Sequence, residues 1–418
     1  MKILILGAGV IGVTSAYYLA KDGHDVTVID ANELPAMGCS YGNGCQLSFC
    51  HIEPWANKSF IVNILKNIFF IKSSISINNV ASKKFLYWLY NFFINSISAN
   101  AVRNSKNLYR ISSYSRELFL KIIAEEDIDF NFNNKGILHF FRSDNELQKA
   151  ISFYKNIGIS HEFEILNRDQ TLEKEPSLSQ IEVKSSLAGA LFFKNDYSGN
   201  CKLFTRNLAN ICQNKYKVKF IYNNKINNIF TNKKKITGIN TESGVLYADN
   251  YVYALGYNGL NLLQGINVIP KISAIKGYSI SSDITNINNC PKIAICDTKN
   301  RVVYSKIDNI YRIAGFAEIN NNNVNIDLSK IKLIKNIAQN SFQNIGKINE
   351  KSKWAGIRPV SFNSLPIIKC EKKYGNLYIN TGHGSLGWTL SLASGMILNF
   401  LMSNKLPERF AFLKKNKY

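Results

Sequence analysis

Three glycines and one carboxylate near the N-terminus have the types and spacing of a phosphate-binding site. They are Gly7, Gly9, Gly12 and Asp30. Gly7 allows a tight turn, Gly9 lets the backbone approach a pyrophosphate, and Gly12 lets a following helix pack closely on a strand. The start of that helix offers free N–H groups and the positive end of its dipole to phosphate. Because Asp30 can accept hydrogen bonds from a ribose diol, these residues predict a dinucleotide site.

The elements around these residues support the prediction. An apolar run at Lys2–Leu6 precedes the first glycine, a helical stretch reaches Asp22, and a second apolar run at Val26–Ile29 ends at Asp30. This pattern indicates a strand, a turn, a helix and a second parallel strand. A glycine motif alone is a weak signal, but one framed by two strands and closed by an acid is strong.

A second polar turn, Thr381–Thr389, lies near the other end of the chain and contains His383. The apolar run Leu377–Ile379 leads into it and a helical pattern, Leu386–Leu401, follows. We expect this turn to aim a second helix N-terminus at a bound group, where it would stabilise negative charge on a reduced flavin. The alternative is an ordinary glycine-rich turn with His383 bonded to backbone. Beside the N-terminal motif, the flavin interpretation is favoured.

Arg358 lies between an apolar strand and Pro359, a poor setting for a solvated charge. Its planar guanidinium can hold a carboxylate through two parallel hydrogen bonds, whereas Lys would act only as a point charge. The alternative is a structural Arg paired with a buried Asp or Glu.

Taken together, the motifs resemble the FAD-dependent D-amino-acid oxidase/glycine oxidase superfamily, and most closely its bacterial D-amino-acid dehydrogenase (small-subunit type) members. The resemblance runs from one end of the chain to the other. The matching stretches are Leu6–Asp30, Ser40–Ser48, Pro54–Ala56, Asp196–Thr205, Tyr253–Gly256, Lys276–Ile280, Arg312–Glu318, Trp354–Pro359 and Asn380–Thr389.

The resemblance implies FAD as the cofactor, bound non-covalently because no cysteine clearly matches the flavin-linked cysteine of some members. It implies that Arg358 binds the amino-acid carboxylate and that His383 belongs to the loop around the flavin pyrimidine edge. In oxidase members a tyrosine shares the carboxylate with the arginine; Tyr304 and Tyr278 are the two candidates here. The implied cofactor-binding residues are Ile3, Leu6, Gly7, Ala8, Gly9, Val10, Ile11, Gly12, Asp30, Ser40, Asn43, Gly44, Gln46, Ala254, Gly256, Gly382, Gly384, Leu386 and Gly387.

The implied activity is oxidative deamination of a D-amino acid to a 2-oxo acid and ammonia. Hydride would pass from Cα to flavin N5, and the electrons would go on to a quinone or another acceptor. Two alternatives stay open: an oxidase or dehydrogenase of glycine-, sarcosine- or proline-type amines, and a non-catalytic basic protein that binds membrane or nucleic acid.

The expected fold class is α/β, with a Rossmann-like FAD-binding domain and a second α+β substrate domain that contains an antiparallel sheet. The antiparallel sheet of the second domain is predicted from the β-rich runs Ile272–Ile280, Val302–Ser305 and Tyr311–Gly315. We expect the FAD-binding domain at 1–55, 186–262 and 350–418, and the substrate domain at 56–185 and 263–349.

The chain has 51 Lys and Arg against 29 Asp and Glu, a net charge of +22. Two apolar and aromatic blocks bordered by Lys, at 60–94, are either core helices or helices on a membrane surface. No run reaches the roughly 18 apolar residues that a spanning helix needs. We expect a cytoplasmic protein with reduced cysteines, peripheral association with the inner face of the plasma membrane as an open alternative, no metal site, and no nucleic-acid partner.

Overall fold

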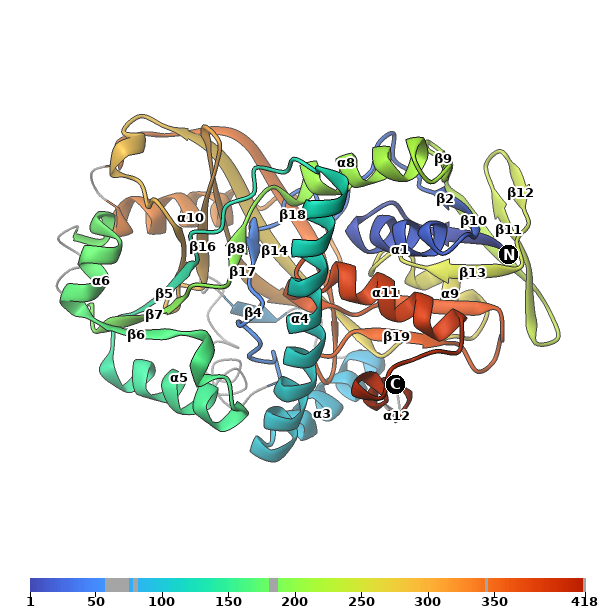
Figure 1. Cartoon of the computed structure of the whole chain (residues 1–418), viewed down its shortest axis with the longest axis horizontal. Helices are drawn as coiled ribbons and strands as arrows, with labels where there is room; N and C mark the ends of the chain where they lie inside the picture. The colour runs from blue at the N-terminus through green and yellow to red at the C-terminus, as the bar shows by residue number, and fades with distance from the viewer. Residues whose placement is uncertain (57–74, 78–81, 180–186, 343–344, 416–418) are drawn as a thin grey trace.

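The computed structural model describes residues 1–56, 75–77, 82–179, 187–342 and 345–415, and Figure 1 shows their arrangement. A six-stranded sheet lies on the right of Figure 1 and a nine-stranded sheet on the left. The long helix α4 (Ser98–Glu126) runs between them. The first of the two apolar blocks, Phe60–Ile71, falls outside the described residues.

The six-stranded sheet contains both strands of the N-terminal motif. Five of its strands are parallel, and only the edge strand β19 runs antiparallel. Its order is β19 (Ile367–Cys370), β20 (Leu377–Thr381), β13 (Asn250–Tyr253), β1 (Lys2–Leu6), β2 (Asp25–Ile29) and β9 (Lys219–Ile221). The carboxyl ends of β20, β13, β1 and β2 therefore lie at one edge, which is where open α/β sheets bind ligands.

Alternate residues of β1 point to opposite faces of this sheet, and both faces are covered. Ile3 and Ile5 pack beneath α1 (Val10–Lys21), whose neighbours are α8 (Cys201–Asn214) and α11 (Ser391–Met402). Leu4 and Leu6 pack on the other face, where a three-stranded ribbon and α9 (Leu260–Gly265) lie. The ribbon consists of β10 (Ile226–Asn232), β11 (Lys235–Thr241) and β12 (Gly244–Leu246). Burial on both faces explains why β1 is apolar from Ile3 to Leu6.

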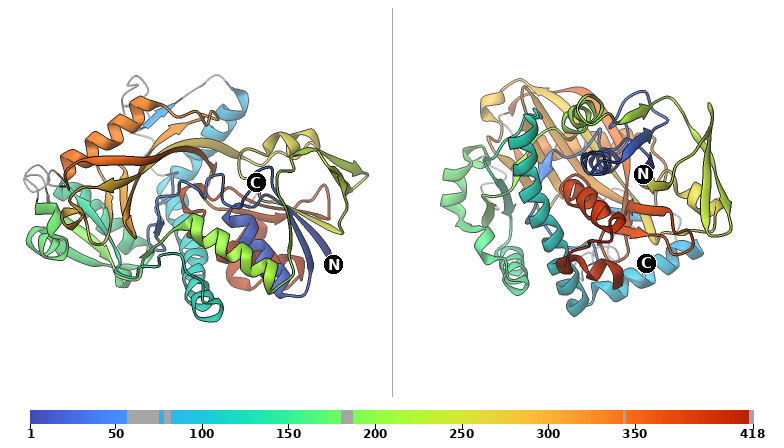
Figure 2. Two further views of the ribbon diagram at one scale, coloured as in Figure 1. Left: turned by 90° about the horizontal axis from the view of Figure 1, so that it is seen from above. Right: turned by 45° about the vertical axis from the view of Figure 1, so that its right-hand side comes forward.

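The nine-stranded sheet is mainly antiparallel. Its order is β18 (Ile348–Ser361), β14 (Ile272–Ile284), β17 (Ile310–Ile319), β16 (Val302–Ile307), β15 (Ala294–Asp297), β5 (Ile137–Phe141), β7 (Gly189–Phe193) and β6 (Glu164–Asn167), with β4 (Ile75–Ile77) beside β17. Helix α10 (Leu328–Ser341) packs on one face through Ile331 and Ile334. The left view of Figure 2 shows β14 and β18 extending from this sheet toward the part of the molecule that contains the N-terminus and the six-stranded sheet. Such long strands can carry side chains from one sheet to the other.

The remaining elements cover the sheets and link them. They are α3 (Lys83–Ser96), α5 (Asp144–Ile157), α6 (Arg168–Lys174), α12 (Phe412–Lys415) and the short pair β3 (Gln46–Leu47) and β8 (Tyr197–Ser198). The described part of the chain contains no helix that is long and apolar enough to cross a bilayer.

The expected fold class is confirmed, since a parallel sheet with helices and a separate antiparallel sheet are both present. The sheets divide the chain differently from the expected domain boundaries at two points. Strand β7 (Gly189–Phe193) and most of β18 (Ile348–Ser361) fall in segments expected to belong to the FAD-binding domain, but both lie in the nine-stranded sheet. Their partners are distant in sequence, so local patterns carried no information about which sheet they join.

Candidate active site

The glycine turn between β1 and α1 has the close packing that its spacing predicts. A Cβ at Gly12 would lie 1.9 Å from the Gly7 carbonyl oxygen, and Gly7 itself has φ +107°. Neither position can hold a larger residue without moving the backbone. Gly9 caps α1, and the Val10 N–H donates to Ser40 Oγ at 3.0 Å. The first turn of α1 therefore faces the loop that carries Ser40.

Asp30 lies directly beside the glycine turn. Its Oδ2 accepts from the Ala8 N–H at 2.7 Å, and its Oδ1 accepts from both N–H groups of Asn32, backbone and side chain. Of the other predicted cofactor residues in this unit, Ile3 is buried near the start of β1, Leu6 ends that strand, and Ile11 is partly exposed on α1. Ile3 thus belongs to the core rather than to the edge where the turn lies.

The other predicted cofactor segments form a line along the same edge. A Cβ at Gly7 would lie 2.9 Å from the Ala254 carbonyl oxygen, just beyond the end of β13. Gly256 has φ +65°, and its carbonyl accepts from Thr381 Oγ1, at the end of β20, at 3.5 Å. The N-terminal motif and the C-terminal turn are therefore joined through residues 254–256.

The turn after β20 differs from the expected helix start. Gly382 and Gly384 have positive φ, and a single 3-10 turn spans Gly384–Leu386. The predicted helix from Leu386 is wrong in its start, because α11 begins only at Ser391, beyond Gly387. The turn thus presents backbone groups of irregular structure, and not the first turn of a long helix, to the edge of the sheet.

His383 is buried in this turn, with a side chain bonded to α11 rather than to the backbone. Its Nε2 lies 2.9 Å from Ser394 Oγ, and burial lowers the pKa of the imidazole to about 3. The ring is therefore neutral at physiological pH, and it ties the turn to α11.

A loop from Ser40 to Gln46 connects the two sheets. Arg312 on β17 donates to the Asn43 carbonyl at 3.1 Å, Ser305 Oγ on β16 donates to the Gly44 carbonyl at 2.9 Å, and Gln46 Nε2 donates to the Ile295 carbonyl at 3.1 Å. This places the predicted residues Ser40, Asn43, Gly44 and Gln46 between the glycine turn and the nine-stranded sheet.

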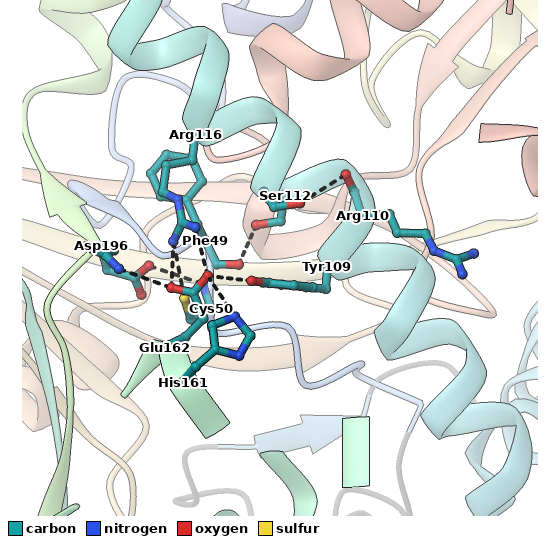
Figure 3. Close-up of polar contacts among 11 residues, drawn as sticks. Phe49, Cys50, Tyr109, Arg110, Ser112, Arg116, His161, Glu162 and Asp196 are labelled. Carbon is teal, nitrogen blue, oxygen red and sulfur yellow. Dashed lines mark hydrogen bonds and ion pairs between the residues drawn. The ribbon is translucent and has the colours of Figure 1, made fainter. Parts of the chain in front are cut away.

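The segment that follows this loop and β3 is fixed by buried polar contacts drawn in Figure 3. The Cys50 N–H donates to Asp196 Oδ1 at 3.1 Å, and Ser112 Oγ on α4 donates to the Phe49 carbonyl. Burial raises the pKa of Asp196 to about 7. Beside it, Arg116 forms an ion pair with Glu162 at 2.7 Å. These contacts anchor the loop to α4 and to the start of β8.

Arg358 lies on β18 with its guanidinium flat against the sheet. A Cβ at Gly277 of β14 would lie 2.2 Å from its Nη2, so only glycine leaves room for it. Its Nη1 donates to the Phe316 carbonyl at 2.9 Å. Among the described residues no Asp or Glu forms an ion pair with Arg358, and burial lowers the pKa of the guanidinium. The alternative of a structural Arg paired with a buried acid therefore has no support in the described chain.

The two tyrosine candidates are not brought together with Arg358. Gly277 lies under the guanidinium, so its neighbour Tyr278 points to the opposite face, where its hydroxyl donates to Glu318 Oε2 at 3.0 Å. Tyr304 also points away from the Ser40–Gln46 loop and packs on Phe342 at 5.0 Å between ring centroids. On β16 the side chains on either side of Tyr304, Val303 and Ser305, face the loop.

Trp354 was missed by the sequence analysis, although it lies next to Arg358 on the same face. A Cβ at Gly42 or at Gly356 would lie about 2 Å from its indole ring. The signal was present in the sequence as glycines at 42, 277 and 356, but they become meaningful only once they are seen to lie beneath Trp354 and Arg358.

The geometry at this edge fits a dinucleotide cofactor. A Cβ would fill the close approach at Gly7 and Gly12, and the Asp30 carboxylate adjoins that turn, as binding of an ADP moiety requires. Residues 382–387 and the Ser40–Gln46 loop extend the edge toward Arg358 and would flank the part of the cofactor that reacts.

Comparison with known proteins identifies the class. Residues 2–401 match the FAD dependent oxidoreductase family, and the chain belongs to that family. It is 34% identical over 411 residues to the D-amino acid dehydrogenase of Neisseria meningitidis serogroup C, covering 98% of this chain and 97% of that protein. Among solved structures it resembles glycine oxidase from Bacillus cereus (TM-score 0.75, 20% identity, 99% and 97% coverage) and L-proline dehydrogenase from P. horikoshii (TM-score 0.75, 16% identity, 99% and 98% coverage).

The predicted enzyme class and the predicted cofactor are therefore confirmed: the protein is an oxidoreductase that depends on FAD. The solved structures share less than a quarter of their residues with this chain, so they support its fold alone. The roles of individual site residues rest on the geometry described above.

Proposed function

We propose that this protein catalyses the oxidative deamination of D-amino acids and passes the electrons to a quinone or another acceptor. The proposal is supported by the 34% identity to the D-amino acid dehydrogenase of N. meningitidis over nearly the whole chain. The observation that carries it is Arg358, a half-buried cation without an acidic partner among the described residues, at the end of the predicted cofactor site.

Arg358 binds the substrate carboxylate, because its half-buried guanidinium has N–H donors that are not used within the described chain. Two such donors can form parallel hydrogen bonds to the two oxygens of a carboxylate. The sheet beneath it prevents rotation, since the side chain rests on Gly277 and is held by the Phe316 carbonyl. Fixing the carboxylate orients the substrate Cα, and such positioning alone can lower a barrier by about 7–11 kcal/mol.

Bound FAD supplies the two-electron oxidant. The substrate loses hydrogen from Cα and from nitrogen to give an imino acid, and water then releases the 2-oxo acid and ammonia. No side-chain base is required at Cα, and His383 is not one, because burial keeps its pKa at about 3 and it is bonded to Ser394. We propose that residues 7–12, 30, 40–46, 254–256 and 382–387 hold FAD without a covalent bond.

The test is the visible spectrum of the purified protein before and after anaerobic addition of D-alanine. We expect a yellow protein whose flavin bands bleach with D-alanine and remain with L-alanine. A yellow protein that no D-amino acid bleaches would contradict the substrate class while leaving the cofactor in place. Denaturation with acid should release the FAD into the supernatant.

Two alternatives from the same family are separated by simple assays. A panel of glycine, sarcosine, proline and D-amino acids distinguishes a secondary-amine enzyme from the proposed one. Comparison of an artificial dye with dissolved oxygen as acceptor distinguishes a dehydrogenase from an oxidase. We expect D-amino acids and the dye to give the higher rates.

We further propose that helix α3 holds the protein against an anionic membrane surface. One face of α3 packs inward through Phe85, Trp88 and Phe92, and Trp88 Nε1 donates to the Val360 carbonyl at 3.0 Å. The outward face is also apolar, which is unusual for a helix on a protein surface. Its exposed apolar and aromatic residues are Leu86, Tyr87, Tyr90 and Phe93, and Ile97 is exposed just beyond the end of the helix.

Basic residues border this face, as an anionic surface requires. Lys83 and Lys84 begin α3, Lys271 lies 5.2 Å from the centre of the Tyr87 ring, and the whole chain carries a net charge of +22. A membrane location would also bring the enzyme to a quinone. Sedimentation with vesicles tests this: we expect binding to vesicles that contain phosphatidylglycerol and little binding to phosphatidylcholine alone.

A further inference from the structure

Strand β17 contains one residue more than its neighbour β14 at the point where it passes Arg358. Lys276 lies opposite Glu318 and Tyr278 lies opposite Gly315, so two steps along β14 match three along β17. The extra residue is taken up at Phe316, which has φ +66°. A residue other than glycine adopts this conformation at a cost, and it persists only where the surroundings hold it.

The bulge serves Arg358 directly. Phe316 has no partner in the register of β14 or β16, and its carbonyl accepts from Arg358 Nη1 at 2.9 Å. This is the one hydrogen bond of the guanidinium that the described residues supply. The direction of a single backbone carbonyl therefore sets the orientation of the group that we assign to the substrate carboxylate.

A buried cluster around Glu318 holds the bulge from the opposite face of the sheet. Glu318 Oε2 accepts from the Tyr278 hydroxyl at 3.0 Å and from Asn321 Nδ2 at 2.7 Å. Lys276 Nζ and Lys330 Nζ lie 4.0 and 3.9 Å from the same carboxylate. Tyr278, Lys276, Glu318 and Lys330 are all at most 6% exposed. In such a poorly solvated place, hydrogen bonds to a charge are strong and losing one partner is costly.

The cluster ties the two strands together on both sides of the extra residue. Along β17, the pair Gly315–Tyr278 precedes the bulge and the pair Glu318–Lys276 follows it. The side chains of Tyr278 and Lys276 both contact the Glu318 carboxylate. Lys330 adds a tie to α10. Without this carboxylate, Lys276 and Lys330 lose a nearby negative charge and Tyr278 loses its hydrogen-bond acceptor, so the torsion at Phe316 is no longer enforced.

We infer that Glu318 is a positioning residue: with Tyr278 it fixes the bulge at Phe316 and thereby the carboxylate-binding orientation of Arg358. This inference rests on the proposed function, because it takes Arg358 as the substrate anchor. It also gives Tyr278 a role on the face of the sheet that does not carry Arg358.

The test measures carboxylate binding separately from turnover. The variants are Glu318→Gln and Tyr278→Phe, and the probe is propionate, a carboxylate without an amine, titrated into the FAD-loaded enzyme by calorimetry. Changes along such a relay alter binding by about 2- to 30-fold. We expect roughly tenfold weaker propionate binding and a similar rise in KM for D-alanine with Glu318→Gln, about two- to threefold with Tyr278→Phe, and kcat and the flavin spectrum nearly unchanged.

Glu126→Gln is the matched control. Like Glu318, Glu126 has a buried carboxylate bonded to tyrosine and lysine side chains, and it lies at the end of α4, outside the nine-stranded sheet. Glu126 accepts from the Tyr17 and Tyr216 hydroxyls at 2.8 and 2.6 Å and from Lys215 Nζ at 2.8 Å, and its side chain is 2% exposed. We expect this variant to lower the Tm as much as Glu318→Gln does without weakening propionate binding.

Four results overturn the inference. If Glu318→Gln binds propionate as tightly as the parent, the positioning role of Glu318 is refuted and the proposed function stands. The same holds if Glu126→Gln weakens propionate binding as much as Glu318→Gln does. If Glu318→Gln does not fold, unchanged binding in Tyr278→Phe refutes it in the same way. A parent enzyme that binds no propionate refutes the carboxylate site itself, and with it the proposed function.

Discussion

Replacing Arg358 with leucine tests the centre of the proposed mechanism. The substitution removes the guanidinium that rests on Gly277 and donates to the Phe316 carbonyl, and it leaves an apolar side chain on the same strand. The glycine turn at Gly7–Gly12 lies at the edge of the other sheet, so binding of the ADP part of the cofactor should survive the substitution.

The expected loss can be worked out from the contacts. The substrate carboxylate would lose two charge-assisted hydrogen bonds in a partly buried place, and truncating one partner of such a pair costs about 2–5 kcal/mol. Since 1.4 kcal/mol corresponds to a factor of ten, kcat/KM for D-alanine should fall between about 30-fold and several thousandfold. Arg358→Lys keeps the charge but loses the fork, and its kcat/KM should lie between those of the parent and the leucine variant.

The same substitution should leave the fold intact or stabilise it. Arg358 has no acidic partner among the described residues, and burial lowers its pKa, which means that its charge is held without full compensation. Removing a partly buried charge that lacks an acidic partner relieves that cost, whereas the lost bond to the Phe316 carbonyl is worth only about 1 kcal/mol. We expect a Tm equal to or above that of the parent.

The assay is anaerobic reduction of the enzyme-bound flavin by D-alanine, followed by absorbance at increasing substrate concentration. The reduction rate of the parent should saturate with D-alanine concentration. The leucine variant should be yellow as purified, because it still contains FAD, and its reduction rate should rise linearly with concentration. Unchanged kinetics would rule out Arg358 as the carboxylate anchor. A colourless variant would show instead that Arg358 supports cofactor binding, which contradicts the separation of the two sites.

Three further predictions address the cofactor site, the buried imidazole and the membrane face. Gly12→Ala should give protein without FAD, because its Cβ would lie 1.9 Å from the Gly7 oxygen, whereas Gly265→Ala meets nothing within 4 Å and should keep the yellow colour. The pKa of His383 is about 3 in the folded state against 6.5 when unperturbed, so its contribution to stability is present above pH 6.5 and lost as pH falls toward 3; His383→Gln should flatten that part of the Tm profile. Phe93→Asp, on the exposed face of α3, should abolish sedimentation with anionic vesicles, and Tyr247→Asp, at an exposed aromatic residue just after β12, should not.

Features encoded by a few adjacent residues were predictable from the sequence. The turn at Gly7–Gly12 and the acid at Asp30 lie within one strand–helix–strand unit, so their contacts follow from local spacing. The position of Ala254 and Thr381 beside that turn could be predicted only through the family resemblance, because it depends on strand order in the sheet.

The start of α11 and the sheet that β18 joins could not be predicted from local patterns. Residues 386–390 have apolar residues at a spacing that suits a helix, but the turn through Gly384 and the burial of Trp388 carry the chain through irregular structure first. Strand β18 pairs with β14, from which it is separated by about seventy residues, and no local signal distinguishes that partner from another apolar strand.

The choice between Tyr278 and Tyr304 depends on the faces of strands, and faces depend on register. Tyr278 follows Gly277, and Tyr304 precedes Ser305, so a shift of one residue would have put either tyrosine on the face that Arg358 occupies. The bulge at Phe316 adds one residue on β17 in the same region. Phe316 has a positive φ, but the sequence has no glycine at this position to indicate it. A pattern of residue types cannot reveal such an insertion, because its stabilising contacts come from Glu318 on the far face and from Lys330 on α10. The carboxylate-binding tyrosine of the oxidase members therefore cannot be assigned in this chain by strand position alone. In our inference, Tyr278 instead supports Arg358 from the opposite face of the sheet, through Glu318 and the bulge at Phe316.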